Sequence, residues 1–171
     1  MLTRKTTALL LVLLSFFSNA ATFEEIKRID ALQTEGKTII CTSTNKINID
    51  GVTKPLIINT KITGYVKYNN GKEIIYSVTH QQRNENANTD FSIMSFELKS
   101  SLEENRQRFE IKESSIKVTA YSTAYTETLK NFLKENIIYY VPFDRIKVTN
   151  FPSYEQLPEV PNGAITYCDL M

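Results

Sequence analysis

Hydrophobic residues recur at helical spacing in two segments of the chain. In the first segment they are Phe23, Ile26, Ile29 and Leu32. Thr22 and Glu25 have the spacing of a capping box, in which each residue caps the other at the start of a helix. Gly36 is a typical helix stop. This pattern predicts a short amphipathic helix near the beginning of the chain.

The second helical segment covers residues 123–135. Its apolar positions are Tyr125, Leu129, Phe132 and Leu133. They follow one another at i, i+4, i+7 and i+8, so they share one face of a helix. Ser122 or Thr123 can cap the start, and Asn136 can end the helix.

Most of the remaining chain is rich in Ile, Val, Thr and Tyr and alternates with a period of two, which is typical of strands. We expect a first strand from Lys37, followed by strands at 57–68, 72–80, 91–98, 106–112, 115–120, 137–141, 145–149 and 164–168. The polar run 81–90 predicts a surface loop. Short turns favour antiparallel pairing, so we predict an α+β fold whose antiparallel sheet is curled or closed into a barrel.

The segments 57–68 and 72–80 predict a hairpin whose register can be argued from its side chains. A two-residue turn at Asn70-Gly71 would place Lys67 opposite Ile74 and mix polar with apolar residues. A three-residue loop, 69–71, places Val66 opposite Ile74 and separates the two faces. We prefer the second register, which leaves Tyr65 and Lys67 on the outward face.

Residues 1–20 have the pattern of a signal peptide, with basic Arg4 and Lys5, an apolar stretch at 8–17, and small residues before the expected cleavage point. The apolar stretch is too short to span a bilayer. We therefore expect residues 21–171 to form one exported domain with no stable membrane anchor after processing. An uncleaved N-terminal anchor is the alternative.

The chain has two cysteines, Cys41 and Cys168. In an oxidising compartment, two distant cysteines predict one disulfide, whereas two buried free thiols are the alternative. Because Cys41 stands on the first expected strand and Cys168 on the last, we expect the bridge to join the two ends of the sheet.

The charge balance gives no reason to expect a nucleic acid or an anionic membrane as partner. The chain has 20 basic and 19 acidic residues, and removing residues 1–20 takes away two basic ones. Nucleic-acid binding rests mainly on clustered Lys and Arg. The abundance of Lys, Asn, Ile and Thr favours a bacterial origin, hence the periplasm or the medium. We expect another protein or an envelope component as partner.

No residue cluster in the sequence requires a metal or a cofactor, and we expect neither. His80 is the only histidine, which excludes sites that need two or three imidazoles. It ends an expected strand beside the polar run, where Arg83, Glu85 and Asp90 are close in sequence. His80 is thus a candidate general base, but the sequence favours a strand-end histidine without a catalytic role.

Tyrosine is the remaining indication of function, with nine residues in a chain that lacks Trp. Exposed tyrosines can anchor an interface. The candidate partner-binding residues are Tyr65, Lys67, Tyr139 and Tyr140. The sequence favours the alternative, in which tyrosines on strands lie at the edge of the core with the hydroxyl in water.

Three functions follow, in this order. The sequence favours a non-enzymatic exported module that binds another macromolecule, such as an inhibitor, an immunity-type protein or an envelope accessory protein. The second hypothesis is a carrier of a small apolar ligand inside a barrel, which requires a cavity. The third is a secreted hydrolase acting on a phosphodiester through His80. The shape of the interior separates all three.

Overall fold

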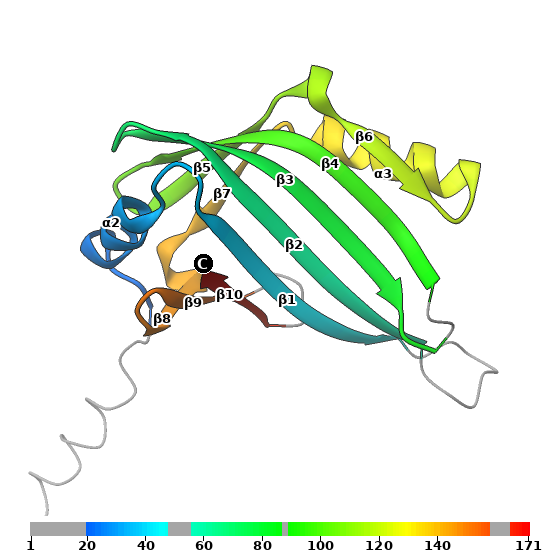
Figure 1. The fold of residues 1–171 in the computed structure, drawn as a ribbon, viewed down its shortest axis with the longest axis horizontal. Coiled ribbons are helices and arrows are strands. Elements are labelled where there is room, and N and C mark those ends of the chain that lie inside the picture. The colour runs from blue at the N-terminus through cyan, green and yellow to red at the C-terminus, as the bar shows by residue number, and fades with distance from the viewer. Residues whose placement is uncertain (1–19, 48–55, 87–88, 158–164) are drawn as a thin grey trace, which may run out of the picture.

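Antiparallel strands form one strongly curled sheet, with one helix across an end of it and a second helix toward the opposite end (Figure 1). This arrangement is that of a computed structural model, which describes residues 20–47, 56–86, 89–157 and 165–171. The predicted α+β class, with a curled antiparallel sheet and two helices, is confirmed. Residues 1–19, which make up all but the last residue of the predicted signal peptide, lie outside the described residues.

The strands are β1 (Thr38–Ile47), β2 (Leu56–Asn69), β3 (Glu73–Asn84), β4 (Thr89–Leu102), β5 (Arg106–Ile111), β6 (Lys117–Ala120), β7 (Ile138–Pro142), β8 (Ile146–Asn150), β9 (Ser153–Gln156) and β10 (Thr166–Leu170). Their order in the sheet is β7-β5-β4-β3-β2-β1-β10-β9-β8, and β6 pairs with β4. The edge strands β7 and β8 are joined by one short 3-10 helix, η2 (Phe143–Arg145). The sheet must therefore curl until its two edges approach each other.

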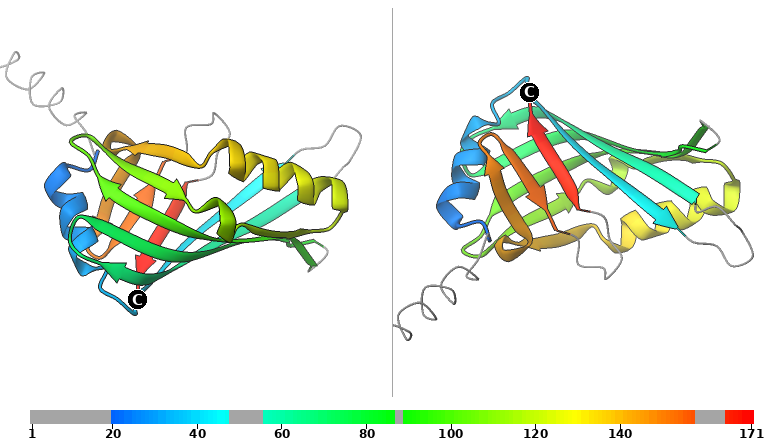
Figure 2. Two further views of the ribbon diagram at one scale, coloured as in Figure 1. Left: turned by 90° about the horizontal axis from the view of Figure 1, so that it is seen from above. Right: turned by 90° about the horizontal axis from the view of Figure 1, so that it is seen from below.

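The helices are α2 (Phe23–Leu32) and α3 (Thr123–Glu135), and a further 3-10 turn, η1 (Glu113–Ser115), precedes β6. Figure 2 shows α2 across one end of the curled sheet and α3 toward the other end. α2 buries Ile26 and Ile29 against the core. Among the described residues, no helix is long and apolar enough to cross a membrane.

The ends of α2 are fixed by the contacts that its sequence predicts. The backbone N–H of Thr22 donates to Glu25 Oε2 at 2.8 Å, and the N–H of Glu25 donates to Thr22 Oγ1 at 3.3 Å, which confirms the capping box. At the other end, Asn69 Nδ2 donates to the carbonyl oxygens of Asp30 and Gln33. A residue of the β2–β3 hairpin thus satisfies carbonyl groups that a helix end leaves without partners.

Replacing Thr22 with alanine is expected to lower the free energy of unfolding by about 1 kcal/mol, because the first turn of α2 loses its side-chain cap. Urea unfolding of the variant and the parent protein measures the change. Thr128→Ala is the matched control, since this exposed threonine lies inside α3 and alanine is the better helix former there. A Thr22→Ala variant as stable as the control would contradict a stabilising cap.

Most residues of the hairpin of β2 and β3 lie on the predicted faces, but the register differs from the predicted one. Val66 pairs with Tyr76, and Ile62 pairs with His80, so the prediction that Val66 lies opposite Ile74 is wrong. The cause is an irregularity between Val66 and Tyr68, which inserts Lys67 as an extra residue. Beyond the bulge the shift is two residues, so the side chains there keep the expected face. Tyr68, on the turn side of the bulge, was expected to face inward with Val66, but it pairs with Ile75 and is exposed.

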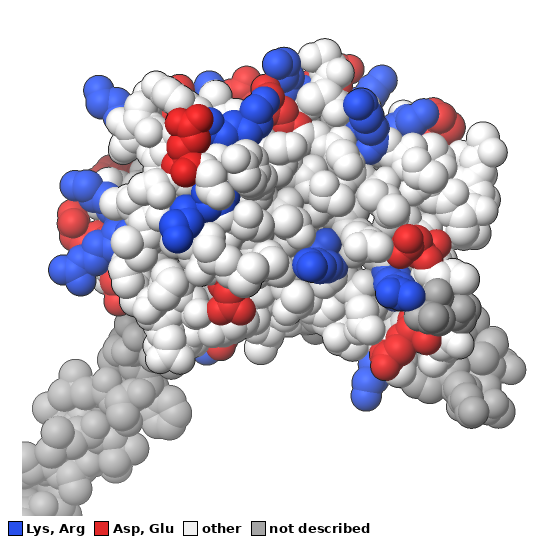
Figure 3. Space-filling view, viewed as in Figure 1, with Lys and Arg blue, Asp and Glu red and all other residues white. Residues whose placement is uncertain are grey.

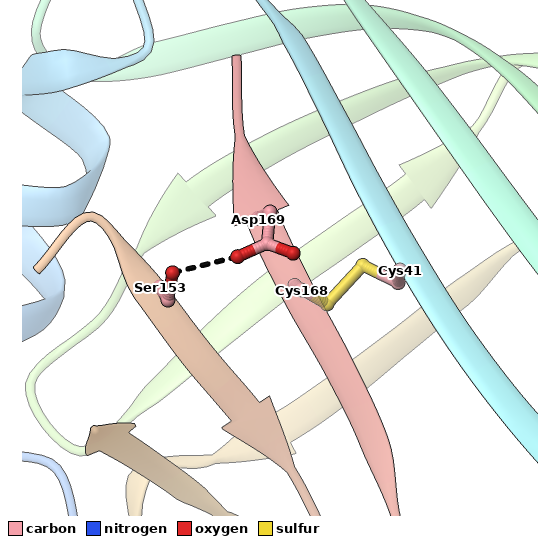
Figure 4. Close-up of a disulfide and its surroundings, with 4 residues drawn as sticks. All are labelled: Cys41, Ser153, Cys168 and Asp169. Atoms are coloured by element: carbon pink, nitrogen blue, oxygen red, sulfur yellow. Dashed lines mark hydrogen bonds between the residues drawn. A yellow bond between two sulfur atoms is a disulfide. The ribbon is translucent and has the colours of Figure 1, made fainter. Parts of the chain in front are cut away.

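The disulfide between Cys41 and Cys168 is confirmed, but its predicted position at the two ends of the sheet is wrong. Cys41 and Cys168 are directly opposite each other on β1 and β10, which are neighbours in the middle of the sheet. The ends of the sheet are β7 and β8. Figure 4 shows the bond running between the two adjacent strands.

The polar run 81–90 was predicted to be a loop, yet much of it belongs to strands. β3 continues to Asn84 and β4 begins at Thr89. Polar side chains on these strands pair with one another: Ser92 Oγ donates to Gln82 Oε1 at 2.9 Å. The sequence also gave no indication of β9, which lies between Pro152 and Pro158.

Candidate ligand-binding cavity

The concave side of the sheet encloses a cavity of about 520 Å³. Its walls come from eight strands of the curled sheet, from the C-terminal part of α3 and from η2. Much of the lining is apolar and includes Ile62, Val78, Met94, Phe96, Leu98 and Ile111. Small-molecule sites in proteins have volumes of about 300 to 1,000 Å³ and mostly apolar walls. The cavity therefore has the size and character of a ligand site.

The wall is built by the alternation of side chains along the strands. The register places Cys41, Ile62, His80 and Met94 in one row across β1, β2, β3 and β4, and all four line the cavity. The neighbouring row, two residues along each strand, contains Ile39, Gly64, Val78 and Phe96, which also line it. Successive inward rows thus form a continuous wall.

Gly64 leaves part of this wall without a side chain. A Cβ atom built at Gly64 meets only Tyr76 Cδ1 within 4 Å, at 3.7 Å, which is an ordinary van der Waals contact. The residue has no backbone conformation that would exclude other amino acids. A larger side chain at position 64 would therefore enter the cavity without straining the strand.

His80 lies in the middle of β3 and faces the cavity, whereas the sequence placed it at the end of a strand. Its cross-strand neighbours are the apolar residues Ile62 and Met94. Burial lowers the pKa of its imidazole, and a contact with the residue's own backbone opposes this effect. Its buried Nδ1 has no hydrogen-bond partner among the described residues. Burial therefore favours the neutral form of the imidazole, which lies in an apolar wall.

The two carboxylates close to His80 in sequence form hydrogen bonds with other residues. Asp90 accepts a hydrogen bond from Gln81 Nε2 at 2.7 Å. Glu85 accepts one from Asn59 Nδ2 at 3.4 Å. No side-chain hydrogen bond or ion pair links either carboxylate to the imidazole within the described part of the chain. The arrangement gives no support to acid–base catalysis at His80.

The candidate partner-binding residues fall into two separate groups. Tyr139 and Tyr140 line the cavity, where the ring of Tyr139 stacks on Phe109 with 5.1 Å between centroids. Tyr65 and Lys67 lie on the outer side of β2, and Lys67 Nζ pairs with Glu97 Oε2 at 2.6 Å. The four residues do not form one surface, and whether either group binds a partner stays a prediction.

A polar cluster lies at the α2 end of the cavity. Asp30 Oδ1 accepts hydrogen bonds from Gln33 Nε2 and Gln107 Nε2, each at 3.2 Å. The hydroxyl of Tyr76 donates to Gln33 Oε1. Burial raises the pKa of Asp30 to about 7, although the hydrogen bond from Gln107 opposes the rise. Burial raises the pKa of Tyr76 as well, and the Asp30 carboxylate adds to that shift.

The sequence reasoning missed this cluster, although a signal was present. Asp30 and Gln33 stand at i+4 and i+7 from Ile26, so they occupy the face of α2 that is otherwise apolar. Polar residues on the buried face of a helix need hydrogen-bond partners. Gln33 and Gln107 both line the cavity, and the cluster gives one end of it a polar boundary.

Exposed residues mark the side on which the cavity reaches the surface. Phe132 of α3 lines the cavity with 57% of its surface exposed, and Tyr140 of β7 does so with 41% exposed. The guanidinium of Arg106 lies 4.0 Å from the centre of the Tyr140 ring, and this cation–π contact stabilises the position of the ring. Arg145 of η2 lines the cavity and is exposed, and Gln156 of β9 and Thr166 of β10 line it and are partly exposed. We call these residues the mouth of the cavity.

On the face seen in Figure 3, the Lys and Arg side chains are interspersed with Asp and Glu. Ion pairs between charged side chains of the protein include Arg108 Nη1 with Glu110 Oε2 at 2.7 Å. This surface does not resemble the clustered positive charge of a nucleic-acid interface.

The chain matches no protein-family model, and a search of curated proteins found no similar sequence. The cavity and its mouth are therefore the features from which a function can be argued.

Proposed function

We propose that the protein binds a small apolar or amphiphilic molecule in its cavity and acts as a carrier of that molecule. The observation that carries this proposal is a volume of about 520 Å³ with a largely apolar lining inside the curled sheet. Each methylene group moved from water into such a site contributes about 0.8 kcal/mol to binding. An alkyl or ring system therefore supplies the affinity without any charged contact.

The carrier hypothesis now stands ahead of the macromolecule-binding module that the sequence favoured. A binding module of that kind needs only a filled core and a surface for its partner. A module that binds its partner through its surface does not need a cavity between the inward-facing residues of its strands. The leading hypothesis of the sequence stays a prediction, and so does the hydrolase hypothesis, for which the neighbours of His80 offer no catalytic partner.

We further propose that the protein works in the periplasm or outside the cell. The Cys41–Cys168 bond supports an oxidising compartment. The pattern of residues 1–20 is that of an export signal. A carrier in such a compartment would hold an apolar molecule while it crosses an aqueous space.

The test uses N-phenyl-1-naphthylamine, a neutral dye whose fluorescence rises in apolar sites. The protein is expected to bind it, and Gly64→Ile is expected to weaken binding about tenfold or more, because the new side chain occupies the cavity. Fluorescence titration measures both affinities. The free energy of unfolding should not fall, since isoleucine favours strands more than glycine does.

Thr63→Ile is the matched control for this titration. It adds an isoleucine on the same strand, but on the face opposite the one that lines the cavity. Its affinity for the dye should equal that of the parent protein. A parent protein that does not bind the dye, or a folded Gly64→Ile variant that binds it normally, would refute the proposed function.

A further inference from the structure

The mouth of the cavity carries one formal charge. Among the described residues that line the cavity, Arg145 is the one side chain with a permanent charge, and no carboxylate lies beside it in the lining. The other polar side chains in the lining are neutral amides, hydroxyls and one imidazole. An anionic group at the mouth would therefore meet a single positive charge and no repulsion from the wall.

Arg145 is also free to bind an outside group. No described carboxylate forms an ion pair with it, and its side chain is exposed. An arginine can hold a carboxylate through two parallel hydrogen bonds. Such a contact at the mouth leaves the rest of the ligand inside the apolar cavity.

Backbone hydrogen bonds hold the segment around Arg145, so its side chain extends from a defined Cα position. The carbonyl of Arg145 accepts a hydrogen bond from the N–H of Leu157 at 2.6 Å. The N–H of Phe143 donates to the carbonyl of Asn105 at 3.0 Å. These bonds tie η2 both to the end of β9 and to the turn before β5.

Two neutral hydrogen-bond groups follow Arg145 across the neighbouring strands, first Gln156 and then Thr166. Gln156 pairs with Ile146, the residue after Arg145, and also with Thr166 on the other side. Gln156 and Thr166 both line the cavity, and neither is fully buried. An amide and a hydroxyl beside a guanidinium can donate to the second oxygen of a carboxylate.

We propose that the ligand is an anionic amphiphile with one alkyl chain, whose carboxylate binds Arg145 together with Gln156 and Thr166 while the chain fills the cavity. This inference rests on the proposed function, because it assigns the chemistry of the ligand of the same cavity. It adds a direction of binding, with the head group at the mouth and the tail toward the wall that contains His80.

The test compares dodecanoate with dodecanol, which have the same chain length but differ in the charge of the head group. Each displaces N-phenyl-1-naphthylamine from the protein at a concentration at which it stays monomeric. The parent protein is expected to bind dodecanoate about tenfold more tightly than dodecanol. Arg145→Gln should abolish this preference and leave dodecanol binding unchanged, because only the anionic head group contacts the guanidinium.

Two further variants complete the experiment. Arg145→Lys keeps the positive charge and should retain part of the preference for dodecanoate. Arg28→Gln removes an exposed arginine from α2, which does not line the cavity, and should behave like the parent protein. Together the two variants show whether the preference for dodecanoate depends on the charge at the mouth or on the overall charge of the protein.

Each outcome decides between the two proposals. Equal affinities for dodecanoate and dodecanol in the parent protein, or a preference that persists in Arg145→Gln, would overturn the carboxylate site while the carrier function stands. If the parent protein binds neither the dye nor either amphiphile, the proposed function fails as well.

Discussion

Replacing Cys41 and Cys168 together with alanine is expected to lower the free energy of unfolding by about 3 to 5 kcal/mol. The two cysteines are 127 residues apart in the sequence, so their bond closes a very long loop. A cross-link of this span removes many conformations from the unfolded chain, which raises the free energy of that state. Alanine is a better replacement than serine, because Cys168 is fully buried and the hydroxyl of a serine there would lack a hydrogen-bond partner.

Urea unfolding of the oxidised parent protein and of the double variant measures the loss. Ser153→Ala is the control on the neighbouring strand, where Ser153 Oγ donates to Asp169 Oδ1 at 2.6 Å beside the disulfide (Figure 4). Losing this exposed hydrogen bond should cost about 1 kcal/mol or less. A double cysteine variant that loses no more than the control would show that the bond does not constrain the unfolded chain.

The double variant should keep its cavity at low temperature. β1 and β10 pair over four residues from Ile39 to Thr42, so the wall does not depend on the sulfur bond for its geometry. We expect the folded double variant still to bind N-phenyl-1-naphthylamine, because Cys41 is one of many residues that line the cavity and Cys168 does not line it. This readout separates the stability of the fold from the shape of the site.

Local patterns in the sequence were sufficient for the helices and for most strands. The capping box at Thr22 and the apolar spacing in 123–135 each involve residues within a few positions of one another. The alternation in β2 and β3 also assigned the inward face correctly, except at Tyr68 beside the bulge. Such patterns depend on the local periodicity of the chain, which is visible in one sequence.

Features that depend on pairing between distant segments were not predictable in the same way. The bulge at Lys67 shifted the hairpin register, although the turn residues Asn70 and Gly71 were recognised. The polar strand ends near Gln82 and Ser92 are stable because they pair with each other, which periodicity does not reveal. The position of β1 beside β10 follows from the closure of the whole sheet.

The cavity could not be predicted because an inward-facing residue has the same pattern whether the interior is filled or hollow. One partial signal was Gly64, a glycine inside a strand, which often marks a close approach of a ligand or another backbone. Arg145 gave no signal, since its place at the mouth depends on η2 joining the two edge strands. Its role as a candidate head-group site emerged only from the fold.

Asp30→Asn is expected to stabilise the protein at pH 8 and to leave its stability nearly unchanged at pH 4. Burial raises the pKa of Asp30 from 3.8 to about 7, so the folded protein resists ionisation of this carboxyl group. The unfolded chain ionises it from about pH 4 upward. Between these two values the unfolded state releases a proton that the folded state keeps, so the free energy of unfolding falls as the pH rises.

The stabilising contribution of the protonated group is thus complete below about pH 4 and is lost as the pH approaches 7. Asparagine keeps the Oδ1 acceptor that Gln33 and Gln107 use but carries no charge to desolvate. The gain at pH 8 should be about 1 to 3 kcal/mol. This gain is smaller than the free energy that corresponds to a change in pKa from 3.8 to about 7, because Asp30 keeps some contact with water.

Urea unfolding between pH 4 and pH 8 tests this expectation. The curves of the parent protein and of Asp30→Asn should diverge as the pH rises. Asp144→Asn provides a matched control, because it removes an exposed carboxylate from η2, away from the cluster at α2. Parallel curves for the parent protein and Asp30→Asn would mean that Asp30 ionises in the folded protein as easily as in the unfolded chain. The polar cluster at the end of the cavity would then carry a negative charge at neutral pH, and it would repel an anionic ligand that reached that end.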